Sequence, residues 1–299
     1  MKKILLTGVN GQVGHALQNR LMQYDVVALN REQLDLSDGA AIRRIVQMIQ
    51  PDLIINPAAY TAVDKAETEP DLAYAINAIA PQILAEEAAK LNAALIHFST
   101  DYVYDGSKPG AYVENDLVNP LSVYGKSKLA GEDAIRAVNL PHLILRTSWV
   151  YGAYGKNFLK TIIRLASERD SLRIVADQFG APTSSESIAD AVVSLLTPWQ
   201  PQNASQTGIY HLTNQGKTTW HGFSCAIVDE YNQLAVSKNW PPLKANVENI
   251  AGIPTVEYPT PAARPVNSSL SNSKLNQVFK VMLPDWQAGL QQVMQLVKL

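Results

Sequence analysis

The chain of 299 residues is poor in cysteine, nearly balanced in charge and free of long hydrophobic runs. Its single cysteine, Cys225, excludes an intramolecular disulfide and most cysteine-based metal sites. A formal net charge of −2 gives no general electrostatic attraction to nucleic acid or to an anionic membrane. The first apolar run is too short for a signal peptide or a membrane span. We therefore expect a cytoplasmic protein that binds neither nucleic acid nor a membrane.

Short runs of valine, isoleucine and leucine alternate with segments of helical period through about residue 215. Because these runs are continuous, we expect strands that are covered on both faces, as in a parallel sheet. Right-handed crossovers then predict an α/β fold with a doubly wound, Rossmann-type sheet. The predicted strands are 4–7, 26–30, 53–58, 94–100, 142–148, 172–176 and 208–213. The predicted helices are 12–22, 39–49, 71–91, 120–138, 157–168 and 185–196.

The rhythm of the sequence changes after Gly216. One long helix is predicted over 218–234, followed by a proline-rich stretch and two short helices. We interpret this end as part of a smaller α/β domain. The expected division is a first domain of 1–152 completed by 172–215, and a second domain of 153–171 and 216–299.

A glycine-rich turn follows the first predicted strand, with three glycines in the spacing GxxGxxG. Such a turn lets a pyrophosphate approach the backbone, and the helix N-terminus behind it offers N–H donors to the phosphates. A glycine turn that binds nothing is the alternative, but its place on the first strand of a βαβ series favours a dinucleotide site. The expected cofactor contacts here are Gly8, Asn10, Gly11, Gln12, Val13 and Gly14.

The end of the second predicted strand should select the cofactor, and it reads Asn30-Arg31-Glu32. Arg31 suits a ribose 2′-phosphate, and no acid stands at the strand tip to bind a 2′-hydroxyl. A surface arginine is the alternative interpretation, which Glu32 supports. NADPH is favoured as cofactor, with NADH as the alternative. Further expected cofactor contacts are Asn30, Asp35, Leu36, Ala58, Ala59 and Tyr60.

Tyr124 and Lys128 are i,i+4 neighbours on a predicted helix, which Asn119 can cap with Pro120 in its first turn. Thr100 ends the predicted strand 94–100 and can place a hydroxyl opposite them. In isolation a Tyr–Lys pair is an ordinary surface contact. Together with the glycine turn, the three groups favour a proton donor beside a cofactor.

The lysine charge is expected to acidify the phenol of Tyr124. A charge about 4 Å away, at an effective dielectric constant near 20, contributes on the order of 4 kcal/mol. That energy corresponds to a lowering of the pKa by up to about three units. A free tyrosine with a pKa of about 10 would otherwise be poorly matched to neutral pH.

These motifs resemble those of extended short-chain dehydrogenases/reductases, in which the Tyr–Lys pair is the catalytic signature. Four further segments resemble the dTDP-4-dehydrorhamnose reductase branch, and the match runs in order over essentially the whole chain. They are STDYVY (99–104), RTSWVYG (146–152), DQFGAPT (177–183) and YPTPAARPVNS (258–268). The resemblance implies a dinucleotide-binding first domain and a nucleotide-sugar-binding second domain. It also implies NAD(P)H-dependent reduction of the C4 ketone of dTDP-4-dehydro-β-L-rhamnose, the last step of dTDP-rhamnose synthesis.

The same resemblance assigns the roles of the expected catalytic residues. Tyr124 donates the proton, Thr100 holds the carbonyl oxygen, and Lys128 also binds the nicotinamide ribose. The expected contacts to the dTDP-sugar are Thr100, Asp101, Tyr102, Tyr124, Trp149, Asn157 and Arg264. For Trp149 the alternative is a core residue, and for Arg264 it is a solvated loop arginine. Asn157 is the weaker of the candidates for phosphate.

We expect no bound metal. The five histidines follow no metal-binding spacing. Some relatives are thought to dimerise around magnesium, but the predicted helix 12–22 has no acid, and Glu186 alone would be a poor site. The protein is expected to be a monomer or a weak homodimer. Two alternatives stay open: another nucleotide-sugar reductase or epimerase, and a non-catalytic regulatory subunit resembling the β subunit of methionine adenosyltransferase.

Overall fold

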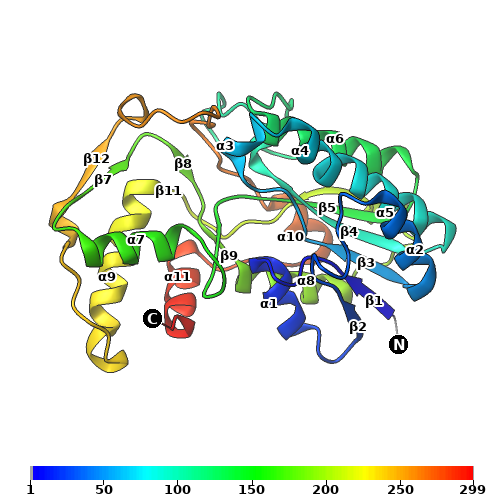
Figure 1. The fold of residues 1–299 in the computed structure, drawn as a ribbon, viewed down its shortest axis with the longest axis horizontal. Coiled ribbons are helices and arrows are strands. Elements are labelled where there is room, and N and C mark those ends of the chain that lie inside the picture. The colour runs from blue at the N-terminus through cyan, green and yellow to red at the C-terminus, as the bar shows by residue number, and fades with distance from the viewer. Residues whose placement is uncertain (1–2, 299) are drawn as a thin grey trace.

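A six-stranded parallel sheet forms the centre of the computed structural model, which describes residues 3–298 (Figure 1). Its strand order is β10-β5-β4-β3-β1-β2, and every neighbouring pair is parallel. The strands are β1 (Lys3–Leu6), β2 (Asp25–Ala28), β3 (Leu53–Asn56), β4 (Ala94–Thr100), β5 (His142–Thr147) and β10 (Gly208–His211).

Helices cover both faces of this sheet, because consecutive strand residues point to opposite sides. Leu5 and Leu6 are adjacent in β1 and pack into different core clusters on opposite faces of the sheet. One face is covered by α1 (Gln12–Arg20), α8 (Ser185–Leu196) and α10 (Ser273–Phe279). The other is covered by α2 (Gly39–Ile49), α5 (Ala80–Lys90) and α6 (Val123–Ala137). The predicted doubly wound α/β fold is confirmed.

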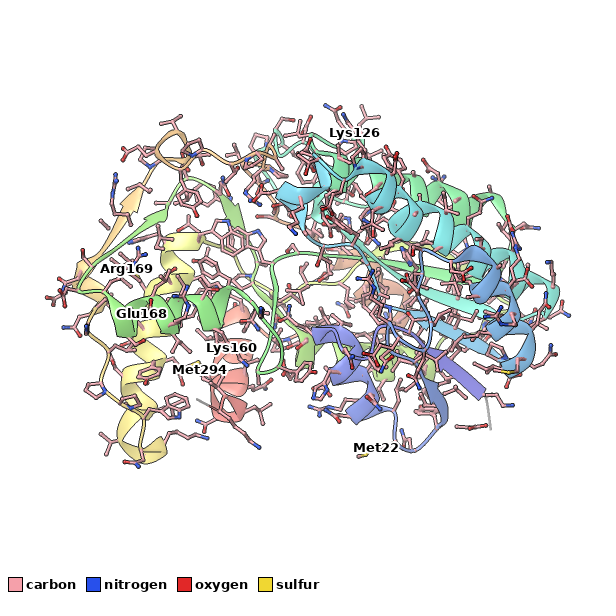
Figure 2. All side chains as sticks on the ribbon, viewed as in Figure 1. Met22, Lys126, Lys160, Glu168, Arg169 and Met294 are labelled. Atoms are coloured by element: carbon pink, nitrogen blue, oxygen red, sulfur yellow. The ribbon has the colours of Figure 1, made fainter. Side chains whose placement is uncertain are left out.

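A second core lies beside the sheet, at the left of Figure 1. It is built by α7 (Phe158–Glu168), α9 (Trp220–Lys238) and α11 (Trp286–Leu296). Figure 2 labels Lys160 on the inner part of α7 and Glu168 and Arg169 at its outer end, so this helix runs outward from the sheet. Aromatic contacts such as Tyr151 against Phe223 fill the space between these helices.

The predicted strand 172–176 forms, but outside the central sheet. β7 (Leu172–Val175) pairs in parallel with β12 (Ile250–Ile253) and packs on α9. Its apolar sequence is the same kind of run as a central strand, and its partner comes from the proline-rich stretch, where no strand was expected. The predicted domain boundaries are not decided by this pairing and stay a prediction.

The predicted helix 71–91 is interrupted. It consists of α4 (Pro70–Tyr74), a wider turn η1 (Ala75–Ile79) and α5. In η1 the side chain of Asn77 accepts a hydrogen bond from Tyr60 N at 2.8 Å and donates to Tyr60 O at 3.0 Å. The wide turn therefore directs a polar side chain to the loop after β3.

The remaining elements are short. They are α3 (Val63–Ala66), β6 (Val150–Tyr151), β8 (Phe179–Gly180), β9 (Thr183–Ser184), β11 (Thr218–Thr219), and the single turns η2 (Asp101–Val103), η3 (Ala204–Gln206), η4 (Val247–Asn249) and η5 (Thr255–Glu257). Among residues 3–298, no helix has the length and apolar character to span a bilayer.

Candidate active site

A cavity of about 670 Å³ opens beyond the carboxyl ends of β1, β3 and β4. In the strand order, β2 lies on one side of β1 and β3 on the other, so the order reverses here. Open α/β sheets bind ligands at such a switch point. The cavity runs from the glycine turn, past the loop after β3, to the first turns of α6.

The glycine turn forms a cradle that only glycine fits. Gly8 has φ +61°, and a Cβ there would lie 2.8 Å from the Cβ of Ala58. A Cβ on Gly14 would lie 2.2 Å from the carbonyl oxygen of Gly8. α1 begins after Gly11 without a side-chain cap, so its first N–H groups are available to an anion. This cradle fits the pyrophosphate of a dinucleotide.

The opposite wall of the cavity includes Arg31, Asp35 and Leu36. The side chain of Arg31 is 74% exposed, and its Nε lies 3.7 Å from the Asp35 carboxylate. Asn30 lies outside the lining, because its side chain closes a turn by accepting from Gln33 N at 3.1 Å. Arg31 is thus loosely held and free to turn towards a phosphate.

The first turn of α6 presses against the end of β4. Ser122 caps the helix by accepting from Gly125 N at 3.2 Å. The predicted cap at Asn119 is wrong, since that amide donates to Asp105 at 3.1 Å and the helix begins later. A Cβ on Gly125 would lie 2.3 Å from the carbonyl oxygen of Tyr102, so helix and strand end are in close contact.

This contact brings Thr100, Tyr124 and Lys128 to one end of the cavity. The Thr100 hydroxyl donates to Asp101 at 3.1 Å and lies within hydrogen-bonding reach of Tyr124, which lowers the pKa of the phenol. Burial has the larger effect and raises the pKa of Tyr124 above its usual range. Burial also lowers the pKa of Lys128, to about 8, and the Glu132 carboxylate opposes that shift.

The expected acidification of Tyr124 by Lys128 is therefore wrong for this arrangement. The ammonium donates to the carbonyl oxygen of Phe98 at 2.7 Å and lies 3.1 Å from His97 Nε2. Its charge is engaged on the sheet side, and desolvation decides the pKa of the phenol. At neutral pH the lysine is charged and the phenol protonated, which is the state that a proton donor needs.

Asp101 and Tyr102 form the wall that faces the open side of the cavity. Asp101 is 3% exposed, its Oδ2 has no hydrogen-bond partner, and burial raises its pKa to about 6. Tyr102 accepts a hydrogen bond from Arg264 at 3.2 Å, and Arg264 in turn pairs with Asp64 at 2.8 Å. Arg264 does not line the cavity and lies behind Tyr102, which does.

Trp149 lines the cavity and also packs on the second core. Its φ of +48° turns the chain so that the indole stacks on Trp220, with ring centroids 3.5 Å apart. Gly180 lies against the other side of the ring, where a Cβ would be 2.5 Å from Cε2. Trp149 therefore lines the cavity and packs towards the second core, and its expected contact with the sugar stays a prediction.

Asn157 lies outside the cavity lining and joins two segments of the chain. It caps α7, and its amide donates to Gln12 at 3.0 Å and to Gly152 O at 2.8 Å. The adjacent Lys156 lines the cavity near the glycine turn. No motif distinguished this lysine from an ordinary surface residue in the sequence.

No group of three or more His, Cys, Asp or Glu residues that could hold a metal occurs in the part of the chain that the structure describes.

A family model described as RmlD substrate binding domain matches residues 1–299. The chain belongs to this family. A dTDP-4-dehydrorhamnose reductase of Burkholderia thailandensis is 45% identical over 288 residues, which is 95% of each chain. The crystal structure of a dTDP-4-dehydrorhamnose reductase from Clostridium acetobutylicum is 36% identical, with a TM-score of 0.89 over 98% of this chain and 99% of that one. The Bacillus anthracis enzyme, solved in complex with NADP, is also 36% identical, with a TM-score of 0.88 over the same shares.

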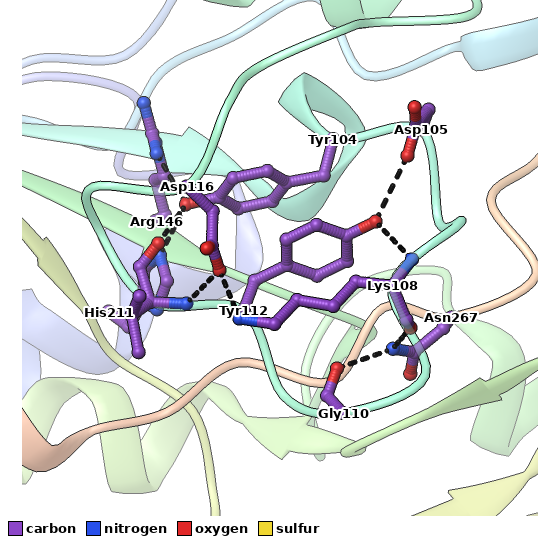
Figure 3. A network of polar contacts seen from close by, with 10 residues as sticks. Tyr104, Asp105, Lys108, Gly110, Tyr112, Asp116, Arg146, His211 and Asn267 are labelled. Atoms are coloured by element: carbon purple, nitrogen blue, oxygen red, sulfur yellow. Dashed lines mark hydrogen bonds and ion pairs between the residues drawn. The ribbon is translucent and has the colours of Figure 1, made fainter.

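Membership of the RmlD family confirms the resemblance that the motifs indicated. In this member of the RmlD family, a polar network includes the buried side chains of Tyr104, Arg146 and His211, which Figure 3 shows. Arg146 of β5 donates to Glu132 of α6 at 2.9 and 2.5 Å and to the hydroxyl of Tyr104 at 2.6 Å. Tyr104 contacts His211 at 2.9 Å and stacks on Tyr112. The network fixes α6 and the loop after β4 to the sheet.

Proposed function

We propose that the protein reduces the C4 keto group of dTDP-4-dehydro-β-L-rhamnose to give dTDP-β-L-rhamnose, the last step of dTDP-rhamnose synthesis. NADPH is the proposed reductant and NADH the alternative. One observation carries the proposal: Thr100, Tyr124 and Lys128 line the same cavity as the glycine cradle. The full-length match to reductases of this name supports the choice of substrate.

The bound cofactor supplies a hydride to C4 of the sugar. The chain's part begins with the glycine cradle and the N-terminus of α1, which hold the diphosphate of the cofactor. Arg31, exposed and only loosely paired, binds the 2′-phosphate. Asp35 and Leu36 border the adenine, and Ala58, Ala59 and Tyr60 let the backbone approach the cofactor.

Tyr124 donates its proton to the oxygen on C4 as negative charge develops there. Thr100 donates a hydrogen bond to the same oxygen and keeps it near the phenol. Lys128 is charged below a pH of about 8 and binds the nicotinamide ribose. General acid catalysis of this kind contributes a factor of about 10² to 10⁴.

The other wall of the cavity binds the sugar nucleotide. Asp101 and Tyr102 contact the sugar hydroxyls, and Trp149 covers the apolar face of the deoxysugar. Arg264 stands behind Tyr102, outside the cavity lining, and its positive charge favours the dTDP diphosphate on that side. Asn157 acts from outside the lining through its hydrogen bond to Gln12, which directly follows the glycine turn.

We further propose that residues 1–152 and 172–215 form the cofactor domain, and that 153–171 and 216–299 form the sugar-nucleotide domain. The protein is proposed to work in the cytoplasm as a monomer or weak homodimer and without a metal. Gel filtration with light scattering, with and without EDTA, tests the last two points: a stable dimer that EDTA dissociates would contradict them.

The decisive experiment is an assay with purified protein, NADPH and dTDP-4-dehydrorhamnose generated in situ. We expect consumption of NADPH and formation of dTDP-rhamnose, identified by mass spectrometry and NMR. UDP- and GDP-linked 4-keto sugars should give no comparable rate. Equal turnover of those sugars would indicate another nucleotide-sugar reductase, and cofactor binding without any reduction would indicate a regulatory protein.

A further inference from the structure

Lys128 is held from the sheet side by a string of buried side chains. Its Nζ lies 3.1 Å from His97 Nε2 and donates to Phe98 O at 2.7 Å. His97 Nδ1 lies 3.1 Å from the side-chain amide of Asn56, and the other end of that amide is 2.6 Å from Thr7 Oγ1. Thr7, Asn56, His97 and Lys128 are each at most 2% exposed. Bulk water therefore does not reach any of the four side chains.

The sheet fixes this string in place. Thr7 directly follows β1, Asn56 ends β3 and His97 lies in β4, and Asn56 is the register partner of His97. The string begins one residue before Gly8 and ends on α6. It thus links the strand that carries the glycine turn to the lysine at the opposite end of the cavity.

The charge of Lys128 determines which atoms along the string donate hydrogen bonds and which accept them. Burial holds the pKa of His97 well below its usual range, so the imidazole is neutral and has one donor and one acceptor. An ammonium only donates, so Nε2 must accept and Nδ1 must carry the proton. The oxygen of the Asn56 amide then faces Nδ1, and the amide nitrogen faces Thr7.

A neutral amine at Lys128 reverses this order. Thr7 then donates to the oxygen of the Asn56 amide, the amide nitrogen donates to Nδ1, and Nε2–H of His97 donates to Nζ. This is the orientation in which the Asn56 amide stands in the structure. Any other combination of lysine charge, histidine tautomer and amide orientation leaves a buried polar atom unpaired, and this cost disfavours it. The string therefore has two self-consistent states.

We propose that His97 is a positioning residue for Lys128, and that its tautomer switches together with the charge of that lysine. For the part that Lys128 plays in catalysis, the inference rests on the proposed function. Other ionisable groups near the pair are Glu132 one turn further along α6, itself bonded to Arg146, and Asp101 and Tyr124 on the cavity side.

The first test reads the tautomer without using the reaction. In protein labelled with ¹⁵N-histidine, the two ring nitrogens report which of them is protonated, and loss of one signal set in a His97→Gln variant assigns His97. We expect the Nδ1–H tautomer at neutral pH and the Nε2–H tautomer once the pH exceeds the lysine pKa of about 8. One unchanged tautomer across this range would overturn the proposal.

The second test compares two substitutions of the same imidazole. Glutamine places its amide near Nε2 and can still accept from Lys128, whereas asparagine reaches only as far as Nδ1 and Asn56. Loss of the acceptor in His97→Asn disfavours the ammonium form of Lys128. The fall of kcat at alkaline pH should therefore begin at a pH lower by about one unit. At pH values where kcat is already falling, kcat of this variant should be about tenfold below that of the wild type. His97→Gln should restore the wild-type profile.

A matched control uses the buried His142 of β5, whose Nδ1 bonds to Leu140 O far from the cavity. His142→Asn should leave the pH profile of kcat unchanged. Identical profiles for His97→Asn and His97→Gln would show that the residue is only structural. If the wild-type protein reduces no sugar nucleotide, the proposed function fails, and the tautomer measurement still decides the inference about His97.

Discussion

At the residue scale, one oxygen atom of Tyr124 carries the proposed proton transfer. Tyr124→Phe removes that atom and keeps the ring that stands edge-on to Tyr102. We expect kcat to fall by a factor of about 10² to 10⁴ while NADPH still binds. Steady-state kinetics and a fluorescence titration with NADPH measure the two effects separately. Near-normal turnover would remove Tyr124 from the mechanism.

The buried carboxylate of Asp101 is predicted to lower the free energy of unfolding at neutral pH. Burial raises its pKa from 3.8 to about 6, so ionisation is easier in the unfolded chain than in the folded one. Stability is therefore lost as the pH rises from about 4 to about 6, up to roughly 3 kcal/mol. Asp101→Asn should be more stable than wild type at neutral pH but not below about pH 4. Urea unfolding at both pH values measures this.

The same variant should bind the sugar nucleotide less well, because an amide replaces the carboxylate that faces the cavity. The KM for the sugar nucleotide should rise while the KM for NADPH stays constant. An equal gain in stability at both pH values would show that the charge of Asp101 is not the cause.

Local patterns made part of the site predictable. The glycine spacing and the Tyr124–Lys128 pair are read from neighbouring residues, and the cavity contains both. The pKa of Tyr124 was predicted with the wrong sign, because burial depends on contacts that the sequence does not display. His97 stands in the apolar run 94–98, where a histidine is indistinguishable from a core residue. Lys156 belongs to no motif at all.

At the element scale, the buried pair of Glu132 and Arg146 joins α6 to β5. The two side chains are 0% and 2% exposed, and Ser99 adds a further hydrogen bond to Glu132 at 2.5 Å. Glu132→Gln leaves the Arg146 charge buried without a counterion. We expect a loss of about 3–5 kcal/mol in the free energy of unfolding.

Urea unfolding measures this loss, with Glu168→Gln as the control. Glu168 pairs with Arg164 on the surface, where both side chains are at least half exposed, so its loss should cost no more than about 1 kcal/mol. Equal losses in both variants would contradict a special role for the buried pair.

The sequence predicted which strands and helices form better than it predicted which strands pair with one another. The strands β3, β4 and β5 were recognisable as apolar runs, since each is buried on both faces. β7 has the same appearance but pairs with β12, a partner 75 residues or more away that no local pattern reveals. α6 begins after its cap, Ser122, where its first turn fits against Tyr102, and no local pattern in the sequence reveals that contact either.

At the scale of the whole molecule, Trp149 connects the cavity to the second core. Gly180→Ala would place a methyl group 2.5 Å from Trp149 Cε2 and displace the indole. We expect a loss of about 1–3 kcal/mol in stability and a raised KM for the sugar nucleotide, with the KM for NADPH unchanged. Gly110→Ala is the control, because its Cβ meets no atom within 4 Å. A rise of the KM for NADPH alone would contradict the assignment of Trp149 to the wall that binds the sugar nucleotide.

The stack of Trp149 on Trp220 also has an optical consequence. Two parallel indoles at 3.5 Å couple their electronic transitions and give a joint signal in near-ultraviolet circular dichroism. One ring lines the cavity, while the other begins α9 of the second core. A sugar nucleotide that moves the first ring alters this signal without any added label. Circular dichroism during a titration with the sugar nucleotide therefore tests the proposed contact with Trp149.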